Sequence, residues 1–407
     1  MRFSDGQFRG VVSAAVVAAG LLAYANTFQN GFVWDDVSSI LVNQHIQDPS
    51  QIGQLFREDF HAFGRGQGNF YRPLLAVTFL LDFALSNPGE RGDAQTLMNL
   101  LSPFLFHVSN LFWHLAAALC LFALASRLRA PRYVQAALPT LYALHPLHTE
   151  AVAYISGRAD PMAAAWMFAG LWCGVAAVEK TGRRGALALG GVCTFFVFAL
   201  FTKESATIFP ALLALVIGLR PHEADAQPIP VFRKLRPIAL AIPILLVYVL
   251  LRMTLLHFAD ASGEAAPLGT RLTQTLQALA LYVKLAILPT GLHMERSLDN
   301  APGWLAIVGG ALLAALALWT IHAWRTQRTR AALGLLWFLA GWLPVSGLFP
   351  LNAPMAEHWM YVPIAGLLWA ILEYVSPLLQ TPRARVAAWT VTYVYALLLL
   401  GLTVDRN

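Results

Sequence analysis

Two adjacent acidic residues, Asp35 and Asp36, follow the first long apolar stretch in the segment "NGFVWDDVSSI". A carboxylate in such a place can act as a general base, which takes the proton of a hydroxyl group as that group attacks a substrate. Two solvated acids in an ordinary loop would give the same pattern. Successive residues of an extended segment point to opposite faces, so one of the two aspartates at most can face a substrate.

Further ionisable residues interrupt the apolar sequence, and "HPLHTEAVAYISGRAD" (145–160) is the richest such segment. Arginine and lysine suit a phosphate group, and arginine has a planar fork that can bind two phosphate oxygens. The candidate binding residues are Arg72, His145, His148, Glu150, Arg158, Asp160, Lys203, Glu204, Arg296, Glu357 and His358.

Each of these groups also has a structural interpretation. Arg158 and Asp160 fit a structural ion pair, and Lys203 fits a lysine whose stem lies along apolar surface. The two histidines and the glutamate of "HPLHTE" could bind a metal ion, but their spacing matches no standard zinc pattern. Any one segment alone therefore decides nothing.

The composition places these residues in a membrane protein. Of the 407 residues, 57% are hydrophobic and 12% are charged, whereas about 25% are charged in an ordinary soluble domain. Apolar stretches of nearly membrane-spanning length recur along the chain, so we predict an all-α polytopic protein. The eleven predicted spans are 10–27, 103–126, 133–147, 161–178, 185–202, 206–219, 237–256, 303–324, 331–350, 360–376 and 386–403.

Basic residues set the predicted orientation. Short connections such as 127–132, 180–184 and 325–330 carry bare clusters of Lys and Arg, which mark cytoplasmic loops. The N-terminus is therefore predicted to be cytoplasmic, with the first helix retained rather than cleaved. Because the formal net charge of +6 reflects these loops, it indicates no nucleic-acid partner.

Two outer segments complete the predicted layout, in which residues 1–407 form one transmembrane domain. The first outer loop, 28–102, is expected to hold a juxtamembrane helix near 73–81. The second, 257–302, contains an apolar run at 273–289 that Lys284 interrupts. If this run crossed the membrane, the basic "RTQRTR" cluster would lie outside, so we predict a re-entrant or interfacial helix.

In this layout every unusual polar cluster lies on the outer face. Ionisable groups at membrane depth are costly and usually mark a functional site. A transporter or flippase, the competing class, should place its charges near the membrane centre on broken helices. Gathering at one face favours an enzyme that works at the interface.

Several segments carry a resemblance to a known family. "FVWDD", "YRPL", "HPLHTEAVAYISGRAD", "KESA" and "AEHWMYVP" resemble the membrane part of the transmembrane and tetratricopeptide-repeat O-mannosyltransferases. That family is similar to the larger GT-C group of glycosyltransferases. Its members usually continue into tetratricopeptide repeats, whereas this sequence stops at "GLTVDRN"; either the member lacks the repeats or the chain is truncated.

The resemblance implies a sugar donor linked to a polyprenyl phosphate and an acceptor hydroxyl, with a Ser or Thr of an exported protein as the expected acceptor. Transfer to a lipid or surface glycan is the alternative. No cofactor is expected, and a divalent metal ion is possible but not favoured. The Ala-, Leu- and Arg-rich composition favours a bacterial inner membrane, with the site facing the periplasm.

The resemblance also implies residue roles. Asp35 is the expected base, and Asp36 orients it or holds the backbone. Arg158 is the first candidate for the donor phosphate and Asp160 aims its guanidinium. Lys203, Arg72 and Arg296 are the next phosphate candidates, and His145, His148 and Glu150 shape the pocket.

Overall fold

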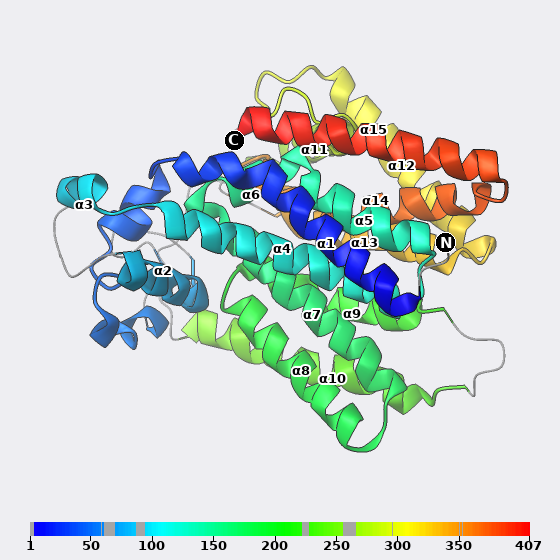
Figure 1. Ribbon diagram of the computed structural model, residues 1–407, viewed down its shortest axis with the longest axis horizontal. Helices are drawn as coiled ribbons and strands as arrows, with labels where there is room; N and C mark the ends of the chain where they lie inside the picture. The colour runs from blue at the N-terminus through cyan, green and yellow to red at the C-terminus, as the bar shows by residue number, and fades with distance from the viewer. Residues whose placement is uncertain are drawn as a thin grey trace.

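The computed structural model describes residues 4–57, 59–60, 70–86, 94–221, 228–254, 266–294, 296–349, 351 and 353–407. Within these ranges every regular element is helical (Figure 1), as predicted. Seven of the described helices are long and apolar enough to cross a membrane. They are α1 (Asp5–Tyr24), α4 (Phe104–Arg127), α7 (Ala159–Glu179), α8 (Gly182–Leu200), α10 (Val231–Thr254), α12 (Trp304–Arg325) and α15 (Pro382–Arg406).

The four remaining predicted spans coincide with shorter helices. These are α5 (Arg132–Leu144), α9 (Phe209–Gly218), α13 (Thr329–Trp342) and α14 (Pro363–Val375). Tighter 3₁₀ turns extend three of them, because η8 (Glu204–Ile208) precedes α9, η9 (Leu343–Val345) follows α13 and η11 (Ser376–Leu378) follows α14. Each predicted span thus falls on a helix, while eleven crossings of a membrane stay a prediction.

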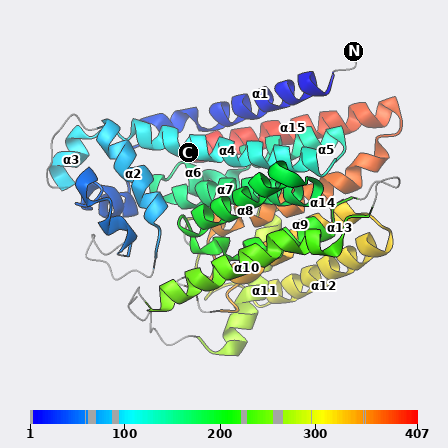
Figure 2. The ribbon, with the colours of Figure 1, turned by 90° about the horizontal axis from the view of Figure 1, so that it is seen from below.

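The helices lie side by side in one bundle, with α7 packed against α4, α8 and α9 (Figures 1 and 2). Small residues allow close approach of helix backbones, as is usual in membranes. At the α13–α14 contact, a Cβ added to Gly334 would lie 2.6 Å from the Gly366 carbonyl oxygen. The α13–α14 pair therefore depends on glycine at this crossing.

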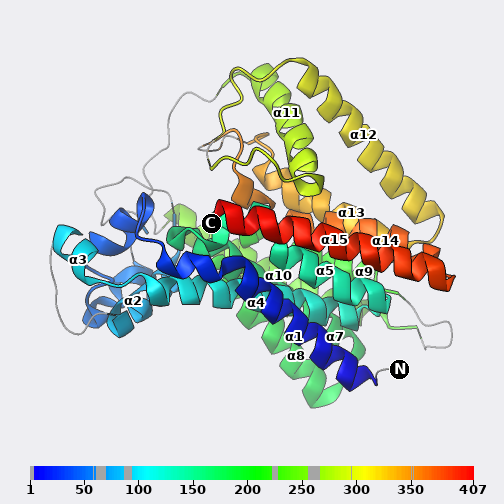
Figure 3. The same cartoon turned by 45° about the horizontal axis from the view of Figure 1, so that its top comes forward.

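One end of the bundle gathers the basic connections and the chain's N-terminus (Figure 3). Arg132 pairs with Asp5 at 2.6 Å, and Arg127 pairs with Glu179 at 2.8 Å. The basic loops thus share one end, as the orientation rule requires. Which membrane side this end faces stays a prediction.

The opposite end carries the short helices η2 (Val37–Leu41), α2 (Pro73–Ser86) and α3 (Ala94–Leu100) (Figure 1). A second hydrophobic cluster that includes Ile40, Phe79 and Phe106 holds them on the bundle. The predicted outer helix at 273–289 falls on α11 (Leu268–Ile287), which packs on α12 and is not among the seven long apolar helices. Its placement outside the membrane stays a prediction.

Candidate functional site

A cavity of about 200 Å³ opens at the end of the bundle away from the N-terminus. Six of the predicted site residues line it although they are far apart in the sequence: Asp35, Arg72, Glu150, Asp160, Lys203 and His358. The predicted convergence of these segments is therefore present in the fold. Tyr154, Ser156 and Trp359 contribute further polar and aromatic walls.

The Asp36 carboxylate is used to fix the loop. It is buried and accepts hydrogen bonds from the Ser156 backbone N–H at 2.8 Å, the Ser156 hydroxyl at 2.6 Å and the Val33 N–H at 3.1 Å. Burial nevertheless raises the pKa of Asp36 to about 6. Its donors join the segment after α1 to the segment before α7.

The Asp35 carboxylate has different surroundings. It is exposed and lines the cavity, and it makes no hydrogen bond or ion pair with the residues that the structure describes. Only the backbone of Asp35 is tied, because its N–H donates to the Tyr154 hydroxyl at 3.0 Å. Trp34, the residue before the pair, has a positive backbone angle (φ 49°), and this left-handed conformation turns the chain there. The backbone is thus held while the carboxylate stays open to a ligand.

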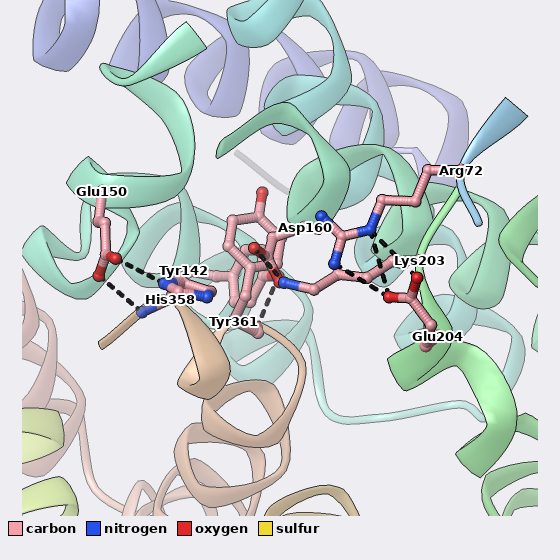
Figure 4. Close-up of polar contacts among 8 residues, drawn as sticks. All are labelled: Arg72, Tyr142, Glu150, Asp160, Lys203, Glu204, His358 and Tyr361. Carbon is pink, nitrogen blue, oxygen red and sulfur yellow. Dashed lines mark hydrogen bonds and ion pairs between the residues drawn. The ribbon is translucent and has the colours of Figure 1, made fainter. Parts of the chain in front are cut away.

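Two cationic side chains line the cavity, and each forms an ion pair with a carboxylate (Figure 4). Lys203 Nζ lies 2.6 Å from both carboxylate oxygens of Asp160. Arg72 donates from Nη2 to Glu204 at 2.9 Å, and its guanidinium lies over the Phe70 ring at 4.4 Å. Lys203 is in extended conformation between α8 and η8, which directs successive side chains to different sides. Both cations can therefore meet an anion in the same chamber.

Glu150 and His358 form another ionisable part of the cavity wall. Its Oε2 accepts from the His358 backbone N–H at 3.1 Å, and its Oε1 lies 2.5 Å from His358 Nδ1 (Figure 4). The backbone of Gly157 packs closely against that of Glu150, because a Cβ added to Gly157 would lie 2.4 Å from the Glu150 carbonyl oxygen. The bond to Nδ1 leaves Nε2 as the ring nitrogen for a ligand.

Arg158 corrects one sequence prediction. Its guanidinium pairs with Asp82 at 2.6 Å rather than with Asp160, and its Nε donates to the Asn110 side chain at 2.6 Å. Its side chain is fully buried, lies over the Phe79 ring and is not part of the cavity wall. Residues two positions apart at a helix start do not face each other, so Arg158 and Asp160 point to different partners.

Besides Arg158, Asp36 and Glu204, four further predicted residues lie away from the cavity wall. His145 is buried, with Nε2 3.1 Å from the Ala286 carbonyl oxygen. His148 is buried against the ring of Tyr361, at 4.3 Å between centroids. Both histidines therefore lie behind the pocket that they were expected to shape.

Glu357 and Arg296 are the other two predicted residues that lie away from the cavity wall. Glu357 is buried, accepts from the His293 N–H at 2.7 Å and pairs with Arg406 at 2.6 Å. Arg296 donates to the Gly291 carbonyl at 2.5 Å. Glu357 thus anchors the loop whose next residue, His358, reaches the cavity.

Sequence reasoning missed Asp82 as the partner of Arg158 and Ser156 as the partner of Asp36. Ser156 lies inside the motif "AYISGRAD", so that motif contained the signal. Asp82 is the single charged residue of an apolar stretch. Such a position indicates a buried charge that needs a partner, but it does not identify the partner. Among the described residues no group of three or more His, Cys, Asp or Glu side chains is placed to hold a metal ion.

Comparison with known proteins gives relatives of one kind. The chain is 23% identical to mouse "Protein O-mannosyl-transferase TMTC3" over 405 residues, covering 90% of the chain and 42% of the relative. It is 26% identical to human "Protein O-mannosyl-transferase TMTC2" over 305 residues, covering 70% and 35%. It is 32% identical to fruit-fly "Protein O-mannosyl-transferase Tmtc1" over 150 residues, covering 36% and 16%.

No family model matches the chain. The chain spans about two fifths of the length of TMTC3. The similarity to TMTC3 nevertheless covers 90% of the chain. The chain is therefore similar to the TMTC protein O-mannosyl-transferases over most of its length, which confirms the resemblance carried by its motifs.

Proposed function

We propose that the chain is a membrane glycosyltransferase that moves a mannose-like sugar from a polyprenyl-phosphate donor to an acceptor hydroxyl. The acceptor is a Ser or Thr of an exported protein, and the names of the relatives support this choice over a lipid or glycan acceptor. One observation carries the proposal: a single cavity holds the open carboxylate of Asp35 together with the cations Lys203 and Arg72.

Asp35 is the base in this proposal. Its carboxylate takes the proton of the acceptor hydroxyl as the oxygen bonds to the anomeric carbon. The bond from that carbon to the phosphate oxygen breaks, and the electron pair leaves with the polyprenyl phosphate. Because phosphate is a stable leaving group, no general acid is required. Direct displacement inverts the anomeric carbon, so a β-linked donor gives an α-linked product.

Lys203 and Arg72 meet the donor phosphate. Each is paired with a carboxylate, Lys203 with Asp160 and Arg72 with Glu204. A phosphate that enters can share these cations, and negative charge on it grows as the bond to the sugar breaks. The contacts therefore strengthen in the transition state and accelerate the reaction. This assignment replaces Arg158, whose partners are buried away from the cavity.

His358 completes the binding wall. With Nδ1 bonded to Glu150, its Nε2 can bond to a sugar hydroxyl or to a phosphate oxygen. Its neighbour Trp359 gives the cavity an aromatic face beside Lys203. Glu150 in this arrangement orients the imidazole rather than touching the substrate.

A transporter is the second functional class. Its coupling charges should lie at mid-membrane on interrupted helices. Here the cavity charges lie at one end of the bundle, on loops and helix starts. The bacterial inner membrane, with the cavity on the periplasmic side, is the location that fits the basic opposite end.

The proposal is tested with the purified full chain, a polyprenyl-phosphate mannose labelled in the sugar, and a peptide that contains Ser and Thr. We expect labelled peptide together with free polyprenyl phosphate, and an α-linkage from a β-linked donor by NMR. The matched control is Glu179→Gln at the basic end, which should transfer sugar at the wild-type rate. Intact donor after prolonged incubation, with either peptide or lipid acceptors, would contradict the proposal.

A further inference from the structure

A second large hollow lies far from the cavity, between α1, α5 and α15. This groove has a volume of about 340 Å³ and is lined by residues that include Ala15, Leu141, Trp389 and Ala396. Two threonine hydroxyls in its wall are already bonded within their own helices, Thr392 to the Ala388 carbonyl at 2.8 Å and Thr140 to the Ala136 carbonyl at 2.9 Å. The groove therefore offers an apolar surface to an occupant.

The groove opens outward on two helices that the rest of the protein leaves largely uncovered. Only 11% of the apolar window of α15 and 33% of that of α1 are buried inside the protein. Figure 2 shows α1 and α15 together at one margin of the bundle. In a membrane such a margin faces the lipid chains, so an extended hydrocarbon chain is the apolar molecule at hand.

The end of the groove carries positive charge. Arg9 follows the groove residue Phe8, and Arg385 stands one helical turn before Trp389. Arg9, Arg383 and Arg385 are exposed and make no ion pair with the residues that the structure describes. Arg132 also lies here, with its guanidinium over the Phe8 ring at 5.2 Å. One acid, Asp5, balances this group by pairing with Arg132.

We propose that this groove binds an anionic phospholipid. One acyl chain lies between α1, α5 and α15, and the headgroup phosphate meets Arg9 and Arg385. A neutral lipid would leave the exposed arginines uncompensated. A second copy of the chain fits less well, because a two-fold contact through this face would set the same arginines against each other.

The site is independent of the proposed transfer reaction, since its residues lie at the opposite end of the bundle from the cavity. Its ligand is recognised by two features together, an apolar chain and a negative headgroup. Both features can be removed separately by substitution. This separates a specific site from a general affinity of the bundle for lipid.

The test is native mass spectrometry of the full chain in detergent, with phosphatidylglycerol and phosphatidylcholine that carry the same acyl chains. We expect phosphatidylglycerol to bind more tightly. Changing Arg9→Gln and Arg385→Gln together should weaken it by about fivefold for each arginine and remove the preference. Arg325→Gln, an exposed arginine at the end of α12, is the matched control and should change neither affinity.

The apolar half of the site is tested by filling the groove. Ala15→Trp and, separately, Ala396→Phe should reduce the binding of both lipids, with the helical circular dichroism unchanged. Ala396→Phe decides the question if Ala15→Trp does not fold. Equal affinity of the two lipids for the wild type, equal damage by Arg325→Gln, unchanged lipid binding by the filled groove, or dimers in place of lipid adducts would each overturn the proposal.

Discussion

Two ionic groups stand on either side of the start of α7. On one side, Lys203 and Asp160 line the cavity; on the other, Arg158 and Asp82 are packed between aromatic rings and the Asn110 side chain. A buried pair whose guanidinium is surrounded by acceptors is costly to break and offers no open group to a ligand. The cavity pair can exchange one partner for a phosphate. Burial and partners, rather than residue type, distinguish scaffold from site.

The largest effect should come from the cavity side, at Asp35. Asp35→Asn keeps the shape of the side chain and removes the base, so we expect transfer to fall by about 10²–10⁴-fold. The melting temperature should not change, because the carboxylate has no partner among the described residues. Initial rates of sugar transfer and thermal unfolding on one preparation measure both. Full activity in the variant would remove Asp35 from the mechanism.

On the buried side, Arg158→Ala should act on stability. Removing one partner of a buried pair leaves an uncompensated charge on Asp82, and we expect a loss of about 3–5 kcal/mol. Specific activity of the protein that remains folded should stay near the wild-type value. The double variant Arg158→Met with Asp82→Leu should recover much of the stability. A stable Arg158→Ala protein without activity would return this arginine to the donor site.

Lys203→Ala tests the cavity pair, where we expect activity to fall more than stability. Loss of a positioned donor to the leaving oxygen should lower kcat by about 10²–10³-fold, with a smaller change in melting temperature than Arg158→Ala. Lys203→Arg keeps the charge and should retain part of the rate. The comparison between the two ionic groups would fail if Lys203→Ala unfolded the protein and spared the turnover of the folded fraction.

The smallest expected effect concerns Asp36 and pH. Burial raises the pKa of Asp36 in the folded chain to about 6, above its ordinary value of 3.8, so between these values the folded chain holds a proton that the unfolded chain has lost. The stability of the wild type relative to Asp36→Asn should therefore fall as pH rises through this window. We expect roughly a few degrees in the difference of melting temperatures, measured from pH 4 to 7. A difference that is constant with pH would contradict the burial of an ionisable Asp36.

The sequence predicted much of the fold because apolar stretches near membrane length specify helices without reference to their neighbours. All eleven predicted spans fall on helices. The lengths of α9 and α14 could not be predicted, since 3₁₀ turns at their ends arise from packing.

The site was predictable as a meeting of segments but not as a set of pairs. Asp35, Arg72, Lys203 and His358 share the cavity, as their motifs suggested. The partner of Arg158 was not predictable, because the rotation of α7 decides which side each residue faces. His145, in the same motif as Glu150, ends α5 and contacts the Ala286 carbonyl instead of the cavity, which the motif alone does not specify.

The balance of charge in the cavity bears on how the enzyme would complete its cycle. Two cations, Lys203 and Arg72, stand against four carboxylates, those of Asp35, Glu150, Asp160 and the Arg72 partner Glu204, so the cavity and its ion pairs hold an excess of negative charge. A donor phosphodiester adds one negative charge, whereas the monoester left after transfer carries between one and two near neutral pH. In the proposed reaction, this surplus negative charge would repel the product more than the substrate. Turnover would then end with electrostatic ejection of the spent lipid carrier.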